Sequence, residues 1–120
     1  MPRILPLALA ILAAGSAAFS QPPKAQERRA AAIERGRVVA QARCGACHGV
    51  TANAASPNPE SPPFEDVANR QGLTSATLRH YLRDAHNYPD AMQFRIDRAQ
   101  VRDLSAYIVT LKRPGYKPAI

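Results

Sequence analysis

The stretch Cys44-Gly45-Ala46-Cys47-His48 holds the only two cysteines of the 120-residue chain. Two residues between the thiols allow both sulfurs to bond to the two vinyl groups of one porphyrin, and the histidine that follows then lies under the iron as an axial ligand. The stretch therefore predicts one c-type haem, attached through Cys44 and Cys47, with His48 as a ligand of its iron.

A Cys-x-x-Cys pair also occurs in zinc sites and in thiol–disulfide exchange proteins. A zinc site needs two further ligands, and the chain has no other cysteine to supply them. An exchange motif is expected at the end of a strand in a βαβ unit, and no such alternation is found here. A structural disulfide or an exchange protein remains the alternative to the haem.

The first 20 residues have the organisation of a secretory signal peptide. Arg3 precedes a mainly apolar run from Ile4 to Ala14, and Ala18 and Ser20 place small side chains for cleavage before Gln21. A membrane span takes about 20 residues, so an uncleaved anchor is the less favoured interpretation. We expect a periplasmic protein, which agrees with the haem because c-type haem is attached outside the cytoplasm in bacteria.

The charge of the chain is basic, with 16 Lys and Arg against 9 Asp and Glu. Loss of the signal peptide removes Arg3 and leaves a net charge of +6. Nucleic acid is a poor candidate partner for an exported chain with no Trp and few aromatic residues. The charge instead suggests steering toward redox partner proteins with acidic docking surfaces. Membrane contact is expected only through an uncleaved signal or a membrane-bound partner complex.

The remaining chain is long enough for one small domain. We expect a signal peptide at 1–20, a leader and the start of the first helix at 21–32, a haem domain at 33–113 and a C-terminal tail at 114–120. No strand pattern is evident, so the predicted fold class is all-α. The predicted elements are an irregular leader at 21–26, a helix at 27–44, a loop at 49–63, a helical turn at 64–69, a helix at 74–85, a loop at 86–96 and a helix from about 98 to 113.

The predicted helices are supported by small residues on the first of them and by N-caps at the start of the later ones. Gly36, Ala40 and Cys44 fall on one narrow stripe together with Ile33, which would let another helix approach closely. Thr74 is placed as an N-cap, with Leu78, Tyr81, Leu82 and Ala85 on one face of its helix. Asp97 and Gln100 are spaced as a capping box before the last helix.

The second axial ligand is sought among the remaining sulfur and imidazole groups, because Met or His usually binds opposite a haem-linked His. After signal removal the chain has one methionine, Met92, and two spare histidines, His80 and His86. His80 falls on the polar face of its predicted helix, whereas His86 shares a loop with Met92. The sequence favours Met92 and leaves His86 as the alternative.

These residues together resemble a class I c-type cytochrome of bacteria. The resemblance rests on Gly36 through His48, the Pro-Pro-Phe at 62–64, Met92, and Leu104 with Tyr107, and it covers about 33 to 111. It implies that the N- and C-terminal helices cross around one buried haem, with Gly36 and Ala40 against Leu104 and Tyr107. It also implies that the Pro62 carbonyl, or that of Pro63, accepts the N–H of His48.

The function implied by the resemblance is electron transfer by a haem with His/Met-ligated iron, in a periplasmic respiratory or dehydrogenase chain, rather than an enzymatic reaction. Arg95 and Arg98 follow Met92 closely and are candidates for the docking surface. Two alternatives keep the haem. The chain could be the cytochrome subunit of a larger oxidoreductase complex, or a gas- or peroxide-binding protein if Met92 does not ligate.

Overall fold

The computed structural model describes residues 22–84 and 95–120, and within these ranges it contains helices and no strands. The fold is therefore all-α, as the sequence predicts. The helices are α1 (Pro23–Val39), α2 (Phe64–Ala68), α3 (Ser75–Asp84) and α4 (Arg98–Ile108), with a π-helical turn (Ala40–Cys44) after α1 and a 3₁₀ turn (Val109–Leu111) after α4. None of the described helices combines the length and the apolar character needed to cross a membrane.

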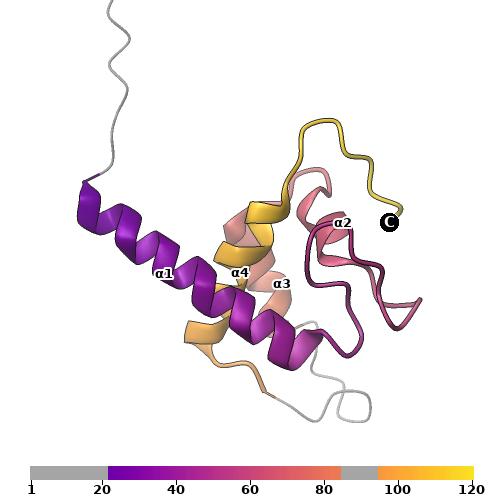
Figure 1. Ribbon diagram of the computed structural model, residues 1–120, viewed down its shortest axis with the longest axis horizontal. Helices are drawn as coiled ribbons and strands as arrows, with labels where there is room; N and C mark the ends of the chain where they lie inside the picture. Colours follow the sequence, from indigo (N-terminus) through magenta and orange to yellow (C-terminus); the bar gives the residue numbers. More distant parts are fainter. Residues whose placement is uncertain (1–21, 85–94) are drawn as a thin grey trace, which may run out of the picture.

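α1 begins earlier than the sequence analysis placed it. Residues 23–26 are helical and not part of an irregular leader, because Pro23 stands at the start of the helix, where its fixed φ and its missing N–H are no disadvantage. Residues 23–31 are exposed, and this end of α1 projects beyond α4 (Figure 1). The other end passes into the π-helical turn, a distortion that is frequent near functional sites.

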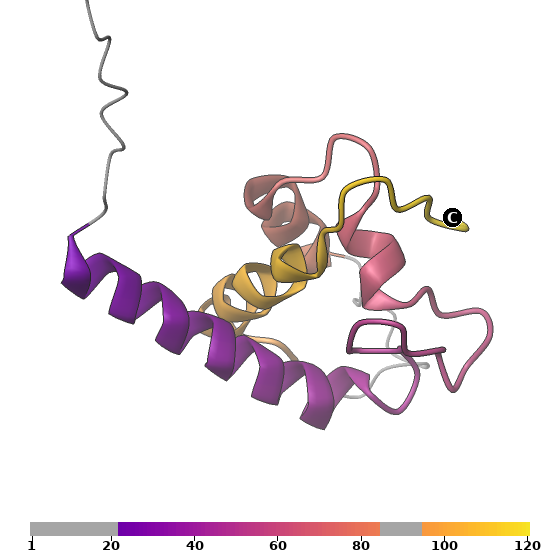
Figure 2. The same ribbon diagram turned by 45° about the horizontal axis from the view of Figure 1, so that its top comes forward.

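α1 and α4 lie against one another where they cross (Figure 2), and the close approach depends on Gly36. A Cβ at this position would overlap the backbone carbonyl of Asp103 and would lie 2.8 Å from Cβ of Tyr107. The predicted close approach of the two terminal helices is therefore confirmed. Beside it, Nε of Arg35 donates to the buried Asp103 carboxylate at 2.6 Å. This hydrogen bond lowers the pKa of Asp103.

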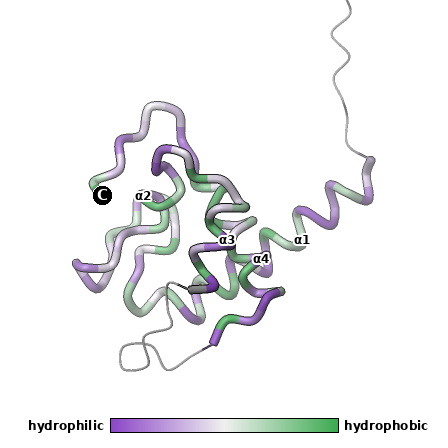
Figure 3. Tube along the Cα trace, turned by 180° about the vertical axis from the view of Figure 1, so that it is seen from behind, coloured by the Kyte–Doolittle hydropathy of each residue, from purple (hydrophilic) through white to green (hydrophobic). Residues whose placement is uncertain are grey.

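The core lies between α4, which packs against α3 and α2, and the π-helical turn that follows α1. The chain trace shows hydrophobic residues along α3 and α4 (Figure 3). Leu78, Leu104 and Ile108 are each at most 1% exposed. They match the helical spacing predicted from the sequence. Tyr81 does not follow the prediction, because its side chain is 57% exposed and does not join Leu78 in the core.

The two predicted N-caps, those of α3 and α4, are confirmed by hydrogen bonds. Oδ1 of Asp97 accepts the Gln100 N–H at 2.8 Å, and Oε1 of Gln100 accepts the Asp97 N–H at 3.1 Å. Oγ1 of Thr74 accepts the Thr77 N–H at 3.1 Å. These caps satisfy N–H groups that have no partner inside the helix. α4 itself ends at Ile108, earlier than predicted, because its last turn tightens to 3₁₀.

Candidate functional site

The backbone of the Cys-x-x-Cys-His stretch forms a turn directly after the π-helical segment. The carbonyl of Cys44 accepts the N–H of Cys47 at 3.0 Å and the N–H of His48 at 2.8 Å. The turn is thus held by hydrogen bonds between the residues of the motif themselves. It brings two thiols and one imidazole together within five residues.

The two thiols differ in their surroundings and are not joined as a disulfide. Cys44 is buried in the core, whereas Cys47 is exposed. Burial raises the pKa of the Cys44 thiol to about 11, and the neighbouring Cys47 adds to this shift. An exchange protein needs a thiol with a lowered pKa. Cys44 is therefore not the activated thiol that such a protein would need.

The ring of His48 is oriented by the proline loop. Its Nδ1 lies 2.8 Å from the carbonyl oxygen of Pro62. A carbonyl can only accept, so Nδ1 carries the proton and Nε2 the lone pair that a metal ligand requires. The carbonyl of Pro63 accepts the N–H of Val67 instead. Of the two prolines considered from the sequence, Pro62 is therefore the one that contacts His48.

α2 forms one wall beside this histidine. The ring centroid of Phe64 is 5.2 Å from that of His48, and the Phe64 N–H donates to the carbonyl of Gly49 at 2.8 Å. Gly49 must lack a side chain, because a Cβ there would overlap the carbonyl of Ala54. The residues just after the motif are therefore closely packed against both the loop and α2.

α4 contributes to the same site through Tyr107. Its hydroxyl donates to the carbonyl of Val50 at 2.7 Å. Burial raises the pKa of this hydroxyl, which keeps it protonated as a donor. The family resemblance marked Tyr107 in the sequence, but the partner of its hydroxyl could be found only in the structure. The last helix thus holds the segment that follows His48.

The donor set fits a covalently bound haem. Cys44 and Cys47 could supply two thioether sulfurs, and the hydrogen bond to Pro62 fixes the His48 tautomer that binds iron through Nε2. Within residues 22–84 and 95–120, no three His, Cys, Asp or Glu side chains gather as a metal-binding group. A zinc site built on the two thiols therefore has no further protein ligands in the described part of the chain.

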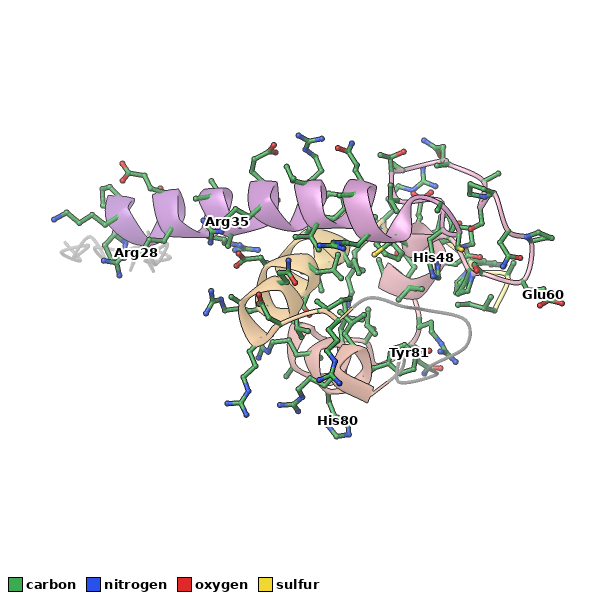
Figure 4. All side chains as sticks on the ribbon, turned by 90° about the horizontal axis from the view of Figure 1, so that it is seen from below. Arg28, Arg35, His48, Glu60, His80 and Tyr81 are labelled. Carbon is green, nitrogen blue, oxygen red and sulfur yellow. The ribbon has the colours of Figure 1, made fainter. Side chains whose placement is uncertain are left out.

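The candidates for the second axial ligand, Met92 and His86, lie outside the described residues. His80 is exposed on α3, as the sequence predicts, and its Nδ1 lies 3.3 Å from Nη2 of Arg83. Figure 4 shows His80 pointing away from the helices, whereas Tyr81 extends toward the side on which His48 lies. Tyr81 was predicted as a core residue from its helical spacing with Leu78, and this spacing did not reveal that its side chain is exposed.

Comparisons with known proteins agree with this geometry. The sequence profile described as cytochrome c matches residues 33–112. The chain is also 32% identical over 83 residues to cytochrome c-552 of Bradyrhizobium diazoefficiens, an alignment that covers 69% of this chain and 78% of that protein. No solved structure matches the chain significantly. Taken with the Cys-x-x-Cys-His turn, the profile and the relative establish that this chain belongs to the cytochrome c family, whose members carry covalently attached haem c and transfer electrons.

Proposed function

We propose that this protein is an exported, single-haem electron carrier whose iron is held by His48 and Met92. It shuttles single electrons between redox partners in a periplasmic respiratory or dehydrogenase chain. The observation that carries the proposal is the 2.8 Å contact between Nδ1 of His48 and the carbonyl of Pro62, beside two thiols that form no disulfide. When bound, the haem supplies an iron that accepts and releases one electron.

The chain's own residues have separate roles in this proposal. Cys44 and Cys47 hold the porphyrin, and the Pro62 carbonyl orients His48 and strengthens it as a donor. Phe64 and Tyr107 keep the segment around His48 packed. Six-coordinate iron needs little rearrangement between its two oxidation states, which suits a carrier rather than an enzyme.

Met92 is proposed as the sixth ligand because it is the only methionine after removal of the signal peptide. A thioether ligand raises the reduction potential of a haem compared with a second histidine. We expect the ferric protein to show the far-red sulfur-to-iron charge-transfer band and Met92→Ala to lose it. His86→Ala is the matched control and should keep the band.

Two outcomes of these spectra would contradict the assignment. Persistence of the far-red band in Met92→Ala would remove Met92 from the iron. Rapid binding of carbon monoxide by the native ferrous protein would instead favour the gas- or peroxide-binding alternative.

Export is tested on the same sample by its intact mass. A mass equal to that of the haem-loaded chain beginning at Gln21 identifies cleavage of the signal peptide. Co-purification with a dehydrogenase or oxidase would favour a subunit over a free shuttle.

The proposed docking surface is basic. Among the described residues, the carboxylates of Glu65, Asp66 and Asp103 are buried, so they contribute little negative charge to the exposed surface. Arg95 and Arg98 are exposed, and neither forms an ion pair with a carboxylate of the described residues. These charges suit partners with acidic surfaces.

Salt dependence tests this docking surface. We expect the rate of reduction by an acidic partner to fall about tenfold between low and high ionic strength, because salt screens attraction between opposite charges. Stopped-flow reduction measures the rate. The Arg95→Gln/Arg98→Gln double variant should show a shallower dependence than Lys24→Gln/Arg28→Gln, which removes the same two charges at the far end of α1. A rate that does not change with salt would contradict a charged docking surface.

A further inference from the structure

The C-terminal segment, defined here as residues 113–119, lies against α2. The family profile ends at residue 112, so this segment is outside the part of the chain that the family shares. It passes α2 in both ribbon views (Figures 1 and 2). Its contacts converge on Glu65 and Asp66, which are 2% and 5% exposed. Two consecutive buried carboxylates on a five-residue helix require partners, because buried charge is costly when unpaired.

The segment supplies these partners. The Tyr116 hydroxyl donates to Oδ1 of Asp66 at 2.6 Å, and the Ala119 N–H donates to Oδ2 of the same carboxylate at 3.3 Å. Nε of Arg113 lies 2.7 Å from Oε1 of Glu65, in an ion pair without hydrogen-bond alignment. The Arg113 guanidinium also stacks over the Tyr116 ring at 4.9 Å. Arg113 and Tyr116 therefore act on α2 as a coupled pair.

Glu65 extends this connection to the loop that follows the haem motif. Its Oε2 accepts the N–H of Asn53 at 2.8 Å. Asn53 has φ of 58°, a left-handed conformation that is uncommon outside glycine and therefore needs support. Nη1 of Arg113 donates to Oδ1 of the same asparagine at 3.2 Å. The C-terminal segment, the loop at 49–56 and α2 thus meet at one buried carboxylate.

α2 in turn carries the groups that contact His48. Pro62 and Pro63 lead directly into it, and Phe64 begins it. The Phe64 N–H is bonded to the carbonyl of Gly49, and the Pro62 carbonyl lies 2.8 Å from Nδ1 of His48. A small displacement of α2 relative to the motif would lengthen this contact, and hydrogen bonds weaken steeply beyond their usual distance.

We propose that Arg113 and Tyr116 are positioning residues for the haem ligand, because they fix α2 and thereby hold the Pro62 carbonyl on the N–H of His48. The inference rests on the proposed function, in which His48 binds the iron. A strong hydrogen bond to Nδ1 makes the imidazole a better donor, which favours the ferric state. Loosening the C-terminal segment should weaken this bond and raise the reduction potential.

The test uses two variants and a control in the haem-loaded protein. Tyr116→Phe removes one hydroxyl and changes no charge, and Arg113→Gln removes the ion pair. Lys117→Gln removes the same charge from an exposed position in the same segment. In the first two variants we expect the His48 Nδ1–H to exchange with solvent about tenfold faster, because each variant loses a contact with a buried carboxylate of α2. We also expect the reduction potentials of these two variants to rise. Lys117→Gln should match the wild type in both measurements.

A reference proton separates positioning from general loss of stability. The amide of Leu104, in the fully buried part of α4, reports opening of the whole domain. The proposal requires exchange of the His48 proton to accelerate more than exchange of the Leu104 amide. Equal acceleration of both protons with an unchanged potential would overturn it. Tyr116→Phe keeps the ring and the net charge, so it provides this comparison even where Arg113→Gln yields no holoprotein.

Failure of the proposed function would be recognised separately. The role of His48 itself would be contradicted if the wild-type protein had no haem spectrum. It would also be contradicted if a variant with His48 replaced kept the iron coordination of the wild type. A normal haem spectrum with unaltered His48 exchange in both variants would contradict only the role of the C-terminal segment.

Discussion

A chain with both Cys44→Ala and Cys47→Ala is expected to contain no covalently attached haem. The two thiols are the only sulfhydryl groups in the sequence, so no other side chain can form a thioether to the porphyrin. Intact mass should equal that of the polypeptide alone, and acidified organic solvent should extract any haem that remains. Each single variant should retain one thioether and a covalent adduct of reduced yield.

Ala46→Ser is the matched control for this loss. Ala46 is exposed and lies between the two cysteines, so the substitution alters the motif without removing a thiol. It should keep the haem in the covalent fraction. Covalent haem found in the double variant would contradict attachment through these two residues.

Gly36→Ala is expected to lower the free energy of unfolding by about 3 kcal/mol, through overpacking at the helix crossing. The added Cβ would meet the backbone carbonyl of Asp103, which cannot rotate away as a side chain can. Helix propensity alone predicts the opposite sign, because alanine in a helix interior is more stable than glycine by up to about 1 kcal/mol. A fall in the free energy of unfolding therefore identifies the steric effect. For a domain of this size the loss corresponds to a fall in Tm of roughly 15 °C.

Thermal unfolding followed by far-UV circular dichroism of the holoprotein measures this effect. Ala31→Val is the control, because Ala31 lies on the exposed part of α1 and the change costs only the small difference in helix propensity. A Gly36→Ala protein as stable as the wild type would show that α1 and α4 can separate without loss. The close crossing would then not be needed for stability.

Features that depend on neighbours in the sequence were predicted correctly. The capping box at Asp97 and Gln100 joins residues three positions apart, and so does the cap at Thr74. The Cys-x-x-Cys-His turn is equally local. The small-residue stripe on α1 predicted a close helix contact, although the partner of Gly36 followed only from the family resemblance. The early start of α1 at Pro23 was missed because the leader was judged by its position after the signal peptide.

The sequence by itself determined the haem motif, the all-α class and the starts of α3 and α4, because short-range hydrogen bonds and helical periodicity fix them. Tertiary structure decided which carbonyl faces His48, that Tyr81 stays outside the core, and that Glu65 and Asp66 are buried beneath the C-terminal segment. Tyr116 and Asp66 are 50 positions apart. The sequence alone does not distinguish a buried aspartate from one exposed to solvent. Only the packing of distant segments removes that charge from water and gives it a partner.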